Sequence, residues 1–460
     1  MTTRHSRSAT ARTPRAGARR RRPAPAAAAL ALALALAPAL AGCSSGGSSS
    51  SDAKHPGGTV VRVPQNFPTI QQAVDVAHEG DTVLVDPGTY RESVRLTKPK
   101  IVLRGTDRNT VVLDGGLRLV NGITASGPGS VVENLTVHGY LANGVLFTGV
   151  TDEKLQQHGA GGSAYDPLDT TRFPAVQGFR ASGVTAYNNG LYGIYAFDAR
   201  GGIIEDSYAS GGADSGIYVG QCKPCDTLVR NNRVERNAVG IEITNASDNL
   251  TVVGNRATGN RVGITLNSND LEALAPQHGA VIVGNVVTDN NATDTPQQAD
   301  GGYGIGIGIG GGTANQVQRN LVQGNRAAGI VITDPPGHPA SGNRIEGNRA
   351  TGNGTDLVLA SVDPANCFTG NQPGVQSPEG LETLAACGTE GRGAPPFGRT
   401  STVQSPPGIP FSQVPVPPAQ PSPPSVSDPN APGRPAVDLP GPVDLNAYPL
   451  PESADALPKH

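Results

Sequence analysis

A repeat of 23 residues between positions 232 and 266 constrains the fold more than any other feature of the sequence. The segment reads NRVERNAVGIEITNASDNLTVVGNRATGNRVGITL, so Asn232 and Asn237 return as Asn255 and Asn260, each pair followed by a Gly-Ile-x-apolar run. A repeat of this length is too small to bury an apolar face alone and must stack on its neighbours. Apolar residues alternate within each run, as in a half-buried β-strand. The sequence therefore predicts a solenoid of stacked strands.

Asparagine and glycine are expected at the corners of this solenoid, because both tolerate the left-handed backbone of tight turns. Stacked asparagines also form ladders of amide hydrogen bonds. We therefore expect two columns of corner residues that run through successive repeats. The first column contains Asp206, Asn232, Asn255, Asn285, Asn320 and Asn343, and the second contains Gly211, Asn237, Asn260, Asn290, Asn325 and Asn348.

These repeats resemble those of the right-handed parallel β-helix superfamily, which includes pectin-modifying enzymes, alginate epimerases, surface adhesins and a copper-site maturation factor of nitrous-oxide reductase. The resemblance covers residues 58–360. It implies an all-β solenoid but no single activity, since one fold carries many activities. Residues 58–115 also resemble the opening of pectin methylesterases, where a short helix precedes Pro-Gly-x-Tyr-x-Glu, here Pro87 to Glu92. We expect a helix after Pro68 that caps the open N-terminal end of the solenoid.

The N-terminal region has the composition of an export signal. Residues 1–42 are first basic and then rich in Ala and Leu, which is the order found in signal peptides. They end in Leu-Ala-Gly before Cys43, which resembles the bacterial lipoprotein signal, in which the cysteine becomes the lipidated first residue. An ordinary cleaved signal with a chance cysteine is the alternative. Residues 43–57 then form a flexible Ser/Gly tether, and the protein is expected on the outer face of the bacterial cell membrane.

The composition changes again after the β-helix domain, which we place at residues 58–388. Residues 391–460 contain 19 of the 40 prolines of the chain and few aromatic residues. This composition predicts a disordered, partly polyproline tail over residues 389–460. The tail is interpreted as a spacer, with reach through a cell wall or binding of a partner as alternatives.

Four cysteines remain after Cys43, and an exported protein meets an oxidising environment. Cys222 and Cys225 form a CxxC pair, and Cys367 and Cys387 lie near the C-terminal end of the solenoid. We predict one disulfide within each pair. A redox-active dithiol or half of a metal site are the alternatives for the CxxC pair.

The outward residues of the repeated strands are the candidates for ligand binding. Successive rungs are about 4.8 Å apart, so equivalent outward residues should stack into columns. Tyr195, Tyr218, Thr265 and Asn267 are the predicted substrate contacts, although alternation of this kind is also expected of any half-buried strand. The first outward column is Tyr195, Tyr218, Glu242, Thr265, Gly306 and Val331, and the second is Phe197, Gly220, Thr244, Asn267, Gly308 and Thr333.

Three carboxylates are candidates for acid/base catalysis. Glu242 stands in the outward column, Asp214 lies in a turn close to Tyr218, and Asp166 lies in an insertion loop. Asp214 can equally be a turn-forming residue in place of asparagine. Insertions at 149–178, 268–279 and 291–302 interrupt the stacking and supply further carboxylates, including Glu272. If two of these loops meet over the Glu242 face, paired carboxylates become available for proton transfer or for Ca²⁺.

The sequence also excludes several function classes. A net charge of −3 gives no basic surface for nucleic acid. The signature motifs of pectin methylesterases and pectate lyases are absent. Asp166-Pro167-Leu168-Asp169 resembles the Asp-Pro-His-Asp motif of alginate epimerases, but leucine replaces the proton-exchanging histidine, which puts epimerase activity in doubt.

Three classes of function remain. The first is a monomeric lipoprotein that binds an extended polysaccharide and, as an enzyme, acts as a lyase, hydrolase or epimerase. The second is a structural or adhesive envelope lipoprotein without catalysis. The third is a copper maturation protein, which would require free thiols at Cys222 and Cys225, and a single methionine makes a poor copper relay.

The lipoprotein signal is tested by Cys43→Ser. The variant should appear in the medium or remain unprocessed, because no thiol remains to carry the lipid. Membrane fractionation and the intact mass of the protein measure this outcome. An unchanged mass and unchanged membrane association of the variant would contradict the prediction.

Overall fold

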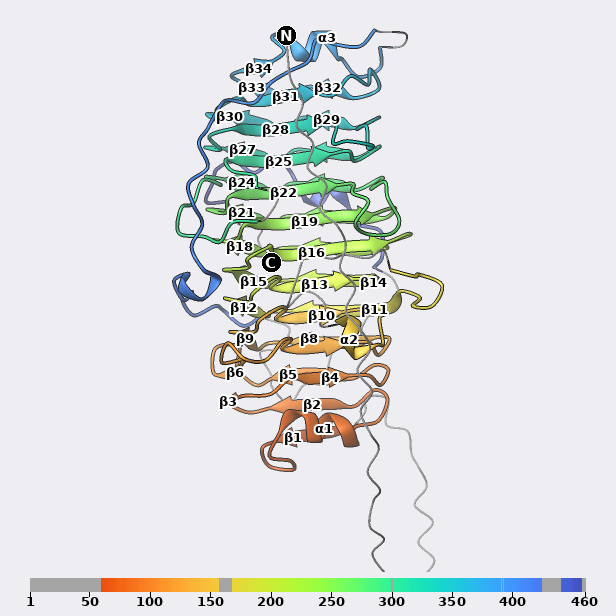
Figure 1. Cartoon of the computed structure of the whole chain (residues 1–460), viewed down its shortest axis with the longest axis vertical. Coiled ribbons are helices and arrows are strands. Elements are labelled where there is room, and N and C mark those ends of the chain that lie inside the picture. The colour runs from red at the N-terminus through yellow and green to blue at the C-terminus, as the bar shows by residue number, and fades with distance from the viewer. Residues whose placement is uncertain are drawn as a thin grey trace, which may run out of the picture. The chain divides into compact units, whose positions relative to one another are not determined.

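The computed structural model describes residues 59–156, 168–298, 301–389, 391, 393–423 and 440–456. The predicted signal peptide, Cys43, the tether and Asp166 lie outside these residues. Within them, three long parallel sheets of 12, 11 and 11 strands coil around one core, as expected for a parallel β-helix. Each turn of the coil adds one strand to every sheet, and Figure 1 shows the strands of successive turns lying one above another.

The strands of the three sheets alternate along the chain. The first sheet contains β1 (Val60–Val63), β2 (Thr82–Val85), β5 (Val102–Gly105), β8 (Ser130–Glu133), β11 (Val176–Ser182), β14 (Ala199–Glu205), β17 (Thr227–Arg230), β20 (Leu250–Val253), β23 (Val281–Val283), β26 (Gln316–Gln318), β29 (Arg344–Glu346) and β32 (Cys367–Thr369). The second contains β3 (Gly88–Tyr90), β6 (Val111–Asp114), β9 (Thr136–His138), β12 (Thr185–Tyr187), β15 (Tyr208–Ser210), β18 (Arg233–Glu235), β21 (Arg256–Thr258), β24 (Val286–Thr288), β27 (Leu321–Gln323), β30 (Arg349–Thr351) and β33 (Gln372–Pro373). The third contains β4 (Val94–Leu96), β7 (Ile123–Ala125), β10 (Val145–Phe147), β13 (Ile194–Phe197), β16 (Ser215–Cys222), β19 (Val239–Ala246), β22 (Val262–Asn267), β25 (Ile305–Gly310), β28 (Ala328–Thr333), β31 (Leu357–Ala360) and β34 (Gln376–Ser377).

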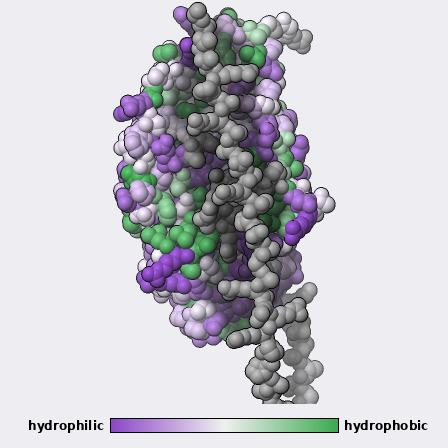
Figure 2. Space-filling model, viewed as in Figure 1, coloured by the Kyte–Doolittle hydropathy of each residue, from purple (hydrophilic) through white to green (hydrophobic). Residues whose placement is uncertain are grey.

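The core is a column of stacked aliphatic side chains inside the coil. Ile241, Ile243, Ile264 and Leu266 are fully buried in it, as the alternation of the repeat predicts. Hydrophobic residues are interspersed with hydrophilic ones over the face visible in Figure 2. Because side chains alternate along a strand, the residues between the inward isoleucines of the third sheet, which include Glu242, point away from the core.

Asparagine ladders hold the corners between the sheets. In the first ladder Asn232 Nδ2 donates to Asn255 Oδ1 (3.0 Å), and the same bond continues to Asn285 (3.0 Å). Each side-chain oxygen also accepts the backbone N–H of the asparagine in the preceding turn. The first ladder is Asn232, Asn255, Asn285, Asn320, Asn348 and Asn371, and the second is Asn237, Asn260, Asn290, Asn325 and Asn353.

The predicted columns are wrong at both ends. At the N-terminal end, Ser207 and Gly212 stand opposite Asn232 and Asn237, in place of the predicted Asp206 and Gly211. Asn348 continues the first ladder, whereas Asn343 belongs to a third ladder with Asn315 and Asn366. Residues 343–347 read NRIEG and residues 348–352 read NRATG, so two successive corners of one turn look alike in the sequence. Only the pairing of β29 with β26 and of β30 with β27 separates them.

The capping helix is confirmed as α1 (Ile70–Val76), with Thr69 as its N-cap. Both oxygens of Glu92 accept backbone N–H groups of the first turn, from Ile70 and Gln71 (2.9 Å each). The Pro-Gly-x-Tyr-x-Glu motif therefore serves stability, since its glutamate fixes the helix against the first turns of the coil. Figure 1 shows α1 at the β1 end of the stack. The other short helices are α2 (Glu153–Gln156), α3 (Leu381–Leu384), η2 (Phe411–Gln413) and η4 (Leu445–Ala447).

The described parts of the Pro-rich tail are not disordered, which corrects the prediction. Residues 393–423 (the proximal strap) and 440–456 (the distal strap) lie along the solenoid and bind it through hydrogen bonds to side chains and backbone (Figure 1). Asn188 Nδ2 donates to the carbonyl of Val414 (2.9 Å), and Arg319 Nη2 donates to that of Leu445 (2.7 Å). Extended Pro-rich backbone makes no internal hydrogen bonds, so its carbonyls are available to such donors. Composition correctly predicts that the tail has no core, but ordering here comes from the solenoid surface.

The ladders are tested by Asn260→Ala. Asn260 accepts two hydrogen bonds from Asn237 and donates to Val234 and Asn290, all in the buried interior. The change should lower the free energy of unfolding by about 2–4 kcal/mol, because buried backbone and amide donors lose their partner. Urea unfolding measures this loss.

Asn267→Ala is the matched control, because Asn267 lies half-buried on the outer face of the neighbouring strand. It should change the free energy of unfolding by no more than about 0.5 kcal/mol. Equal losses for the two variants would contradict a special role for the ladder.

Candidate functional site

The outer face of the third sheet brings most of the predicted site residues into one column. Tyr195 pairs with Tyr218, Tyr218 with Glu242, and Glu242 with Thr265, each one turn of the coil apart. The stacking of these four residues was predicted from the repeat and is confirmed. Neighbouring rungs of parallel strands therefore place two aromatic rings, a carboxyl and a hydroxyl side by side.

The next position in this column is Gly308 and not Gly306 as predicted. Gly306 faces the interior, where an added Cβ would lie 2.5 Å from Cγ1 of Val322. The Gly-Ile-Gly-Ile-Gly run of β25 repeats every second residue, so the sequence alone does not distinguish a register from one shifted by two. Gly310 correspondingly replaces Gly308 in the second column, where it pairs with Thr333.

Three carboxyl groups meet on this face, and we call Asp214, Glu242 and Glu272 the acid cluster. Asp214 directly precedes β16, Glu242 lies in the middle of β19, and Glu272 belongs to the insertion between β22 and β23. Gln298, from the insertion between β24 and β25, joins two of them: its Nε2 lies 2.5 Å from Asp214 Oδ1 and 3.3 Å from Glu242 Oε2. Two insertion loops thus converge over the Glu242 face.

Two tyrosines donate hydrogen bonds to the acid cluster. The Tyr192 hydroxyl donates to Asp214 Oδ2 (2.9 Å), and the Tyr218 hydroxyl donates to Glu272 Oε1 (2.6 Å). The Tyr192 and Tyr195 rings stack with their centroids 4.1 Å apart, and the Tyr218 ring meets Tyr195 edge-on at 4.9 Å. Tyr195 is 8% exposed and Tyr218 only 1%. Tyr218 therefore positions Glu272 and is not available for direct stacking on a ligand, which changes the role predicted for it.

Burial raises the pKa of the two glutamates. Glu242 has a pKa well above its usual range, first because of desolvation and then because of the nearby charges of Asp214 and Glu272. Desolvation raises the pKa of Glu272 to about 8, against the hydrogen bond from Tyr218, which favours its ionised form. Both glutamates are therefore predominantly protonated at neutral pH. Asp214 is half-exposed and accepts hydrogen bonds from Tyr192 and Gln298, which stabilise negative charge on its oxygens.

A shallow polar stretch continues from the acid cluster along the same face. Thr265 and Asn267 are half-buried on β22, and Gly308 and Gly310 follow on β25. An added Cβ at Gly308 would meet nothing closer than 3.7 Å, so this part of the outer face is bare. The Thr265 hydroxyl has no hydrogen-bond partner among the described residues.

Both predicted disulfides are present. Cys222, at the end of β16, is bonded to Cys225, and both side chains are fully buried. Cys367 in β32 is bonded to Cys387, which follows α3 and ties it to the last turns of the coil. In the described parts of the chain, no three His, Cys, Asp or Glu side chains are arranged to hold a metal ion, and no helix is long and apolar enough to cross a membrane.

Sequence reasoning missed Tyr192 and Gln298. Tyr192 stands just before Gly193 and Ile194, where β13 begins. Asp214 stands just before β16, the strand that pairs with β13 in the next turn. These matching positions could have placed Tyr192 beside Asp214. Gln298 lies in an insertion whose path no repeat specifies. Asp166 remains a prediction, because it lies outside the described residues.

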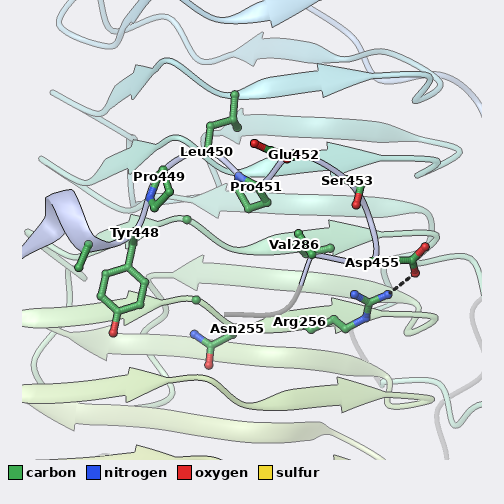
Figure 3. Close-up of a pocket in the computed structure, with 14 residues that line it drawn as sticks. Asn255, Arg256, Val286, Tyr448, Pro449, Leu450, Pro451, Glu452, Ser453 and Asp455 are labelled. Carbon is green, nitrogen blue, oxygen red and sulfur yellow. Dashed lines mark ion pairs between the residues drawn. The ribbon is translucent and has the colours of Figure 1, made fainter. Parts of the chain in front are cut away.

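A cavity of about 660 Å³ lies elsewhere, between the distal strap and the corner that joins the first and second sheets. It is lined by residues such as Asn255, Arg256 and Val286 on the solenoid and by strap residues such as Tyr448, Glu452 and Asp455. Arg256 pairs there with Asp455 (3.5 Å), as Figure 3 shows. No residue of the acid cluster lines this cavity.

Residues 121–275 match the family model for the right handed beta helix region, and they include all three members of the acid cluster. The fold is therefore a right-handed parallel β-helix. No curated protein matches the chain.

Solved structures with a similar backbone include two epimerase modules from Azotobacter vinelandii. The A-module of mannuronan C-5 epimerase AlgE4 is 18% identical, with a TM-score of 0.49, over 66% of this chain and 82% of the other. The A-module of AlgE6 is 18% identical, with a TM-score of 0.46, over 65% and 74%. Pectate lyase Pel9A is 14% identical, with a TM-score of 0.37, over 66% and 73%. At these identities the likeness concerns the fold.

The protonated glutamates predict a pH-dependent stability. Because the folded pKa of Glu272 is about 8 and its ordinary value is 4.5, the folded protein retains a proton that the unfolded chain has already released. The stability associated with this proton is complete below the ordinary pKa and is lost as the pH rises towards the folded one. The raised pKa of Glu242 acts in the same direction. Glu272→Gln should therefore flatten the fall in melting temperature between about pH 5 and about pH 8.

Thermal unfolding monitored by circular dichroism measures this slope. Glu452→Gln is the control, because Glu452 is exposed on the distal strap. Its slope should match that of the wild type. Parallel slopes for wild type and Glu272→Gln would show that Glu272 is ionised in the folded protein.

Proposed function

We propose that the protein binds an extended polysaccharide along the outer face of the third sheet and acts on it by proton transfer at the acid cluster. The observation that carries this proposal is the convergence of two insertion loops on this face: Gln298 bonds Asp214 and Glu242, and Glu272 bonds Tyr218 close enough to affect the pKa of Glu242. Loops on a rigid scaffold are where binding and catalysis concentrate. Buried carboxyls whose pKa values are raised by desolvation and by each other are typical of functional sites.

The shape of the face supports an extended ligand. Its rungs repeat at about 4.8 Å, so equivalent contacts recur along a repeating polymer. Asn267 offers an amide group on this face, while the Thr265 hydroxyl beside it is buried and has no hydrogen-bond partner in the described part of the chain. Beyond them, Gly308 and Gly310 leave room for a sugar ring to approach the backbone closely. A neutral or anionic polysaccharide of the cell envelope or the surroundings fits these features.

The acid cluster supplies the parts of an acid/base reaction. Glu242 carries a proton at neutral pH, while Asp214 accepts hydrogen bonds and is reachable from solvent. A buried protonated acid beside a second carboxyl group that solvent can reach is an arrangement that general acid/base catalysis uses. Gln298 holds Asp214 and Glu242 together. Tyr192 fixes the orientation of Asp214, and Tyr218 fixes that of Glu272. Proton transfer to or from a sugar bound at Asp214 serves hydrolysis, elimination or epimerisation alike.

Location follows from the N-terminal segment. The proposal places the protein outside the cell, anchored through a lipid on Cys43, where envelope polysaccharide is accessible. The flexible Ser/Gly composition of residues 43–57 would allow the β-helix to reach its ligand while it stays anchored as a monomer.

A non-catalytic structural or adhesive protein is the second candidate. The observation that favours it is the burial of Tyr218, Glu242 and Glu272, each less than a tenth exposed. On this account the cluster only fastens two loops to the solenoid. The copper-maturation candidate loses its main support, because disulfide-bonded Cys222 and Cys225 offer no thiolate ligands.

Glycan-array binding followed by calorimetry on the purified protein tests the proposal. Glu242→Gln and Thr265→Val should each weaken binding of the captured glycan about tenfold, since each removes a polar contact in a partly desolvated site. Their melting temperatures should stay close to that of the wild type at acidic pH, where Glu242 is protonated in any case.

Thr251→Val is the matched control, because Thr251 is half-buried on the outer face of the first sheet. It should bind like the wild type. If no glycan binds the wild type, or if all three variants bind equally well, the structural candidate replaces this proposal.

A further inference from the structure

The proximal strap contacts the insertion that carries Gln298. The backbone N–H of Ile409 donates to the carbonyl of Thr295 (2.9 Å), and the N–H of Gly408 donates to Oε1 of Gln297 (3.3 Å). An added Cβ at Gly408 would lie 2.6 Å from the backbone nitrogen of Gln297. The two backbones are therefore in direct contact, and only a residue without a side chain fits between them.

Arg261 fixes the strap to the solenoid directly beside this contact. Its Nη2 donates to the Ser405 hydroxyl (2.9 Å) and to the carbonyl of Pro406. Its guanidinium also lies over the ring of Tyr303, 5.1 Å from the centroid. Arg261 is fully buried and directly precedes β22, so the strap is bound here to the solenoid at the edge of the third sheet.

The residue next to this contact is the one that joins the acid cluster. Gln298 follows Gln297 directly and places its amide on Asp214 and Glu242. The other contacts of the segment hold mainly its first residues. Asn291 is hydrogen-bonded to Gly324, Tyr303 and Arg326, and the N–H of Ala292 donates to the carbonyl of Asn260 (3.1 Å). Nearer to Gln298, Asp294 forms an exposed ion pair with Arg236 (3.3 Å). Exposed ion pairs hold a segment only weakly.

We propose that strap residues 405–409 position Gln298 on the acid cluster, so that the Pro-rich tail is part of the site and not a spacer. The strap braces residues 295–297 against the start of β22, and this bracing holds the Gln298 amide between Asp214 and Glu242. The functional meaning of this positioning rests on the proposed function, but the contact itself is testable without any ligand.

The test uses Gly408→Val in the full chain. The valine side chain cannot fit against Gln297 and should separate the strap from the insertion. Carbodiimide labelling with an amine, followed by peptide mass mapping, reports how accessible each carboxyl is. Labelling of Asp214 and Glu242 should rise about fivefold or more, as expected when a local contact is weakened. Gly441→Val is the matched control, because an added Cβ at this tail glycine meets nothing within 4 Å.

A double-mutant cycle separates positioning from general loosening. Gln298→Ala alone should raise labelling of the two carboxyls to a similar extent, and Gly408→Val should add little in that background, because the strap acts through Gln298. Labelling of Glu452, which is exposed on the distal strap, should stay constant throughout.

Ile409→Pro provides a second route, since proline cannot donate the hydrogen bond to Thr295. Wild-type labelling of Asp214 and Glu242 in both Gly408→Val and Ile409→Pro would overturn the proposal, as would additive effects of Gly408→Val and Gln298→Ala. A lack of glycan binding by the wild type would leave these labelling results standing and would count only against the proposed function.

Discussion

The amide ladders at the corners are the interaction on which the rest of the structure depends. Each ladder asparagine binds the backbone and the side chain of its neighbour in the adjacent turn, so a chain of hydrogen bonds runs along the solenoid beside the aliphatic core. A corner fixed in this way sets the register of the strands that follow it. Because register decides which side chains point outward, the ladders also place Tyr218, Glu242 and Thr265 in one column. The site is a consequence of stacking and not of a local motif.

Electrostatics then explains how three carboxyls can share one small region. Ionising all three carboxyl groups in a region largely shielded from water would cost free energy. The raised pKa values of Glu242 and Glu272 reduce this cost, because they favour the protonated form of each glutamate. The donors Tyr192 and Gln298 are directed at Asp214, the most exposed of the three. The two buried glutamates and the more exposed aspartate thus differ in their environment within one cluster of side chains. A structural ion-pair network would instead place arginine beside the carboxylates, as Arg104 does with the buried Glu133 in an earlier turn.

The repeat was sufficient to predict the solenoid, the inward isoleucines and the outward Glu242 column. The capping helix was predicted from the segment after Pro68, and both disulfides from the spacing of the cysteines in an exported protein. The repeat failed where neighbouring positions look alike. The period of two in β25 concealed a shift from Gly306 to Gly308, and two similar NRxxG corners exchanged Asn343 and Asn348. Contacts made by inserted or Pro-rich segments lie beyond a repeat pattern, because they depend on where a long loop folds back. That is why Gln298, the covered position of Tyr218 and the straps emerged only from the structure.

The central claim is that the acid-cluster face of the third sheet is the ligand site. A crystal structure of the protein with a bound oligosaccharide tests it most directly. The account predicts sugar rings over Thr265, Asn267 and Gly308, with an oxygen about 3 Å from Asp214 or Gln298. An oligosaccharide bound only to the second sheet, or in the cavity under the distal strap, would contradict it.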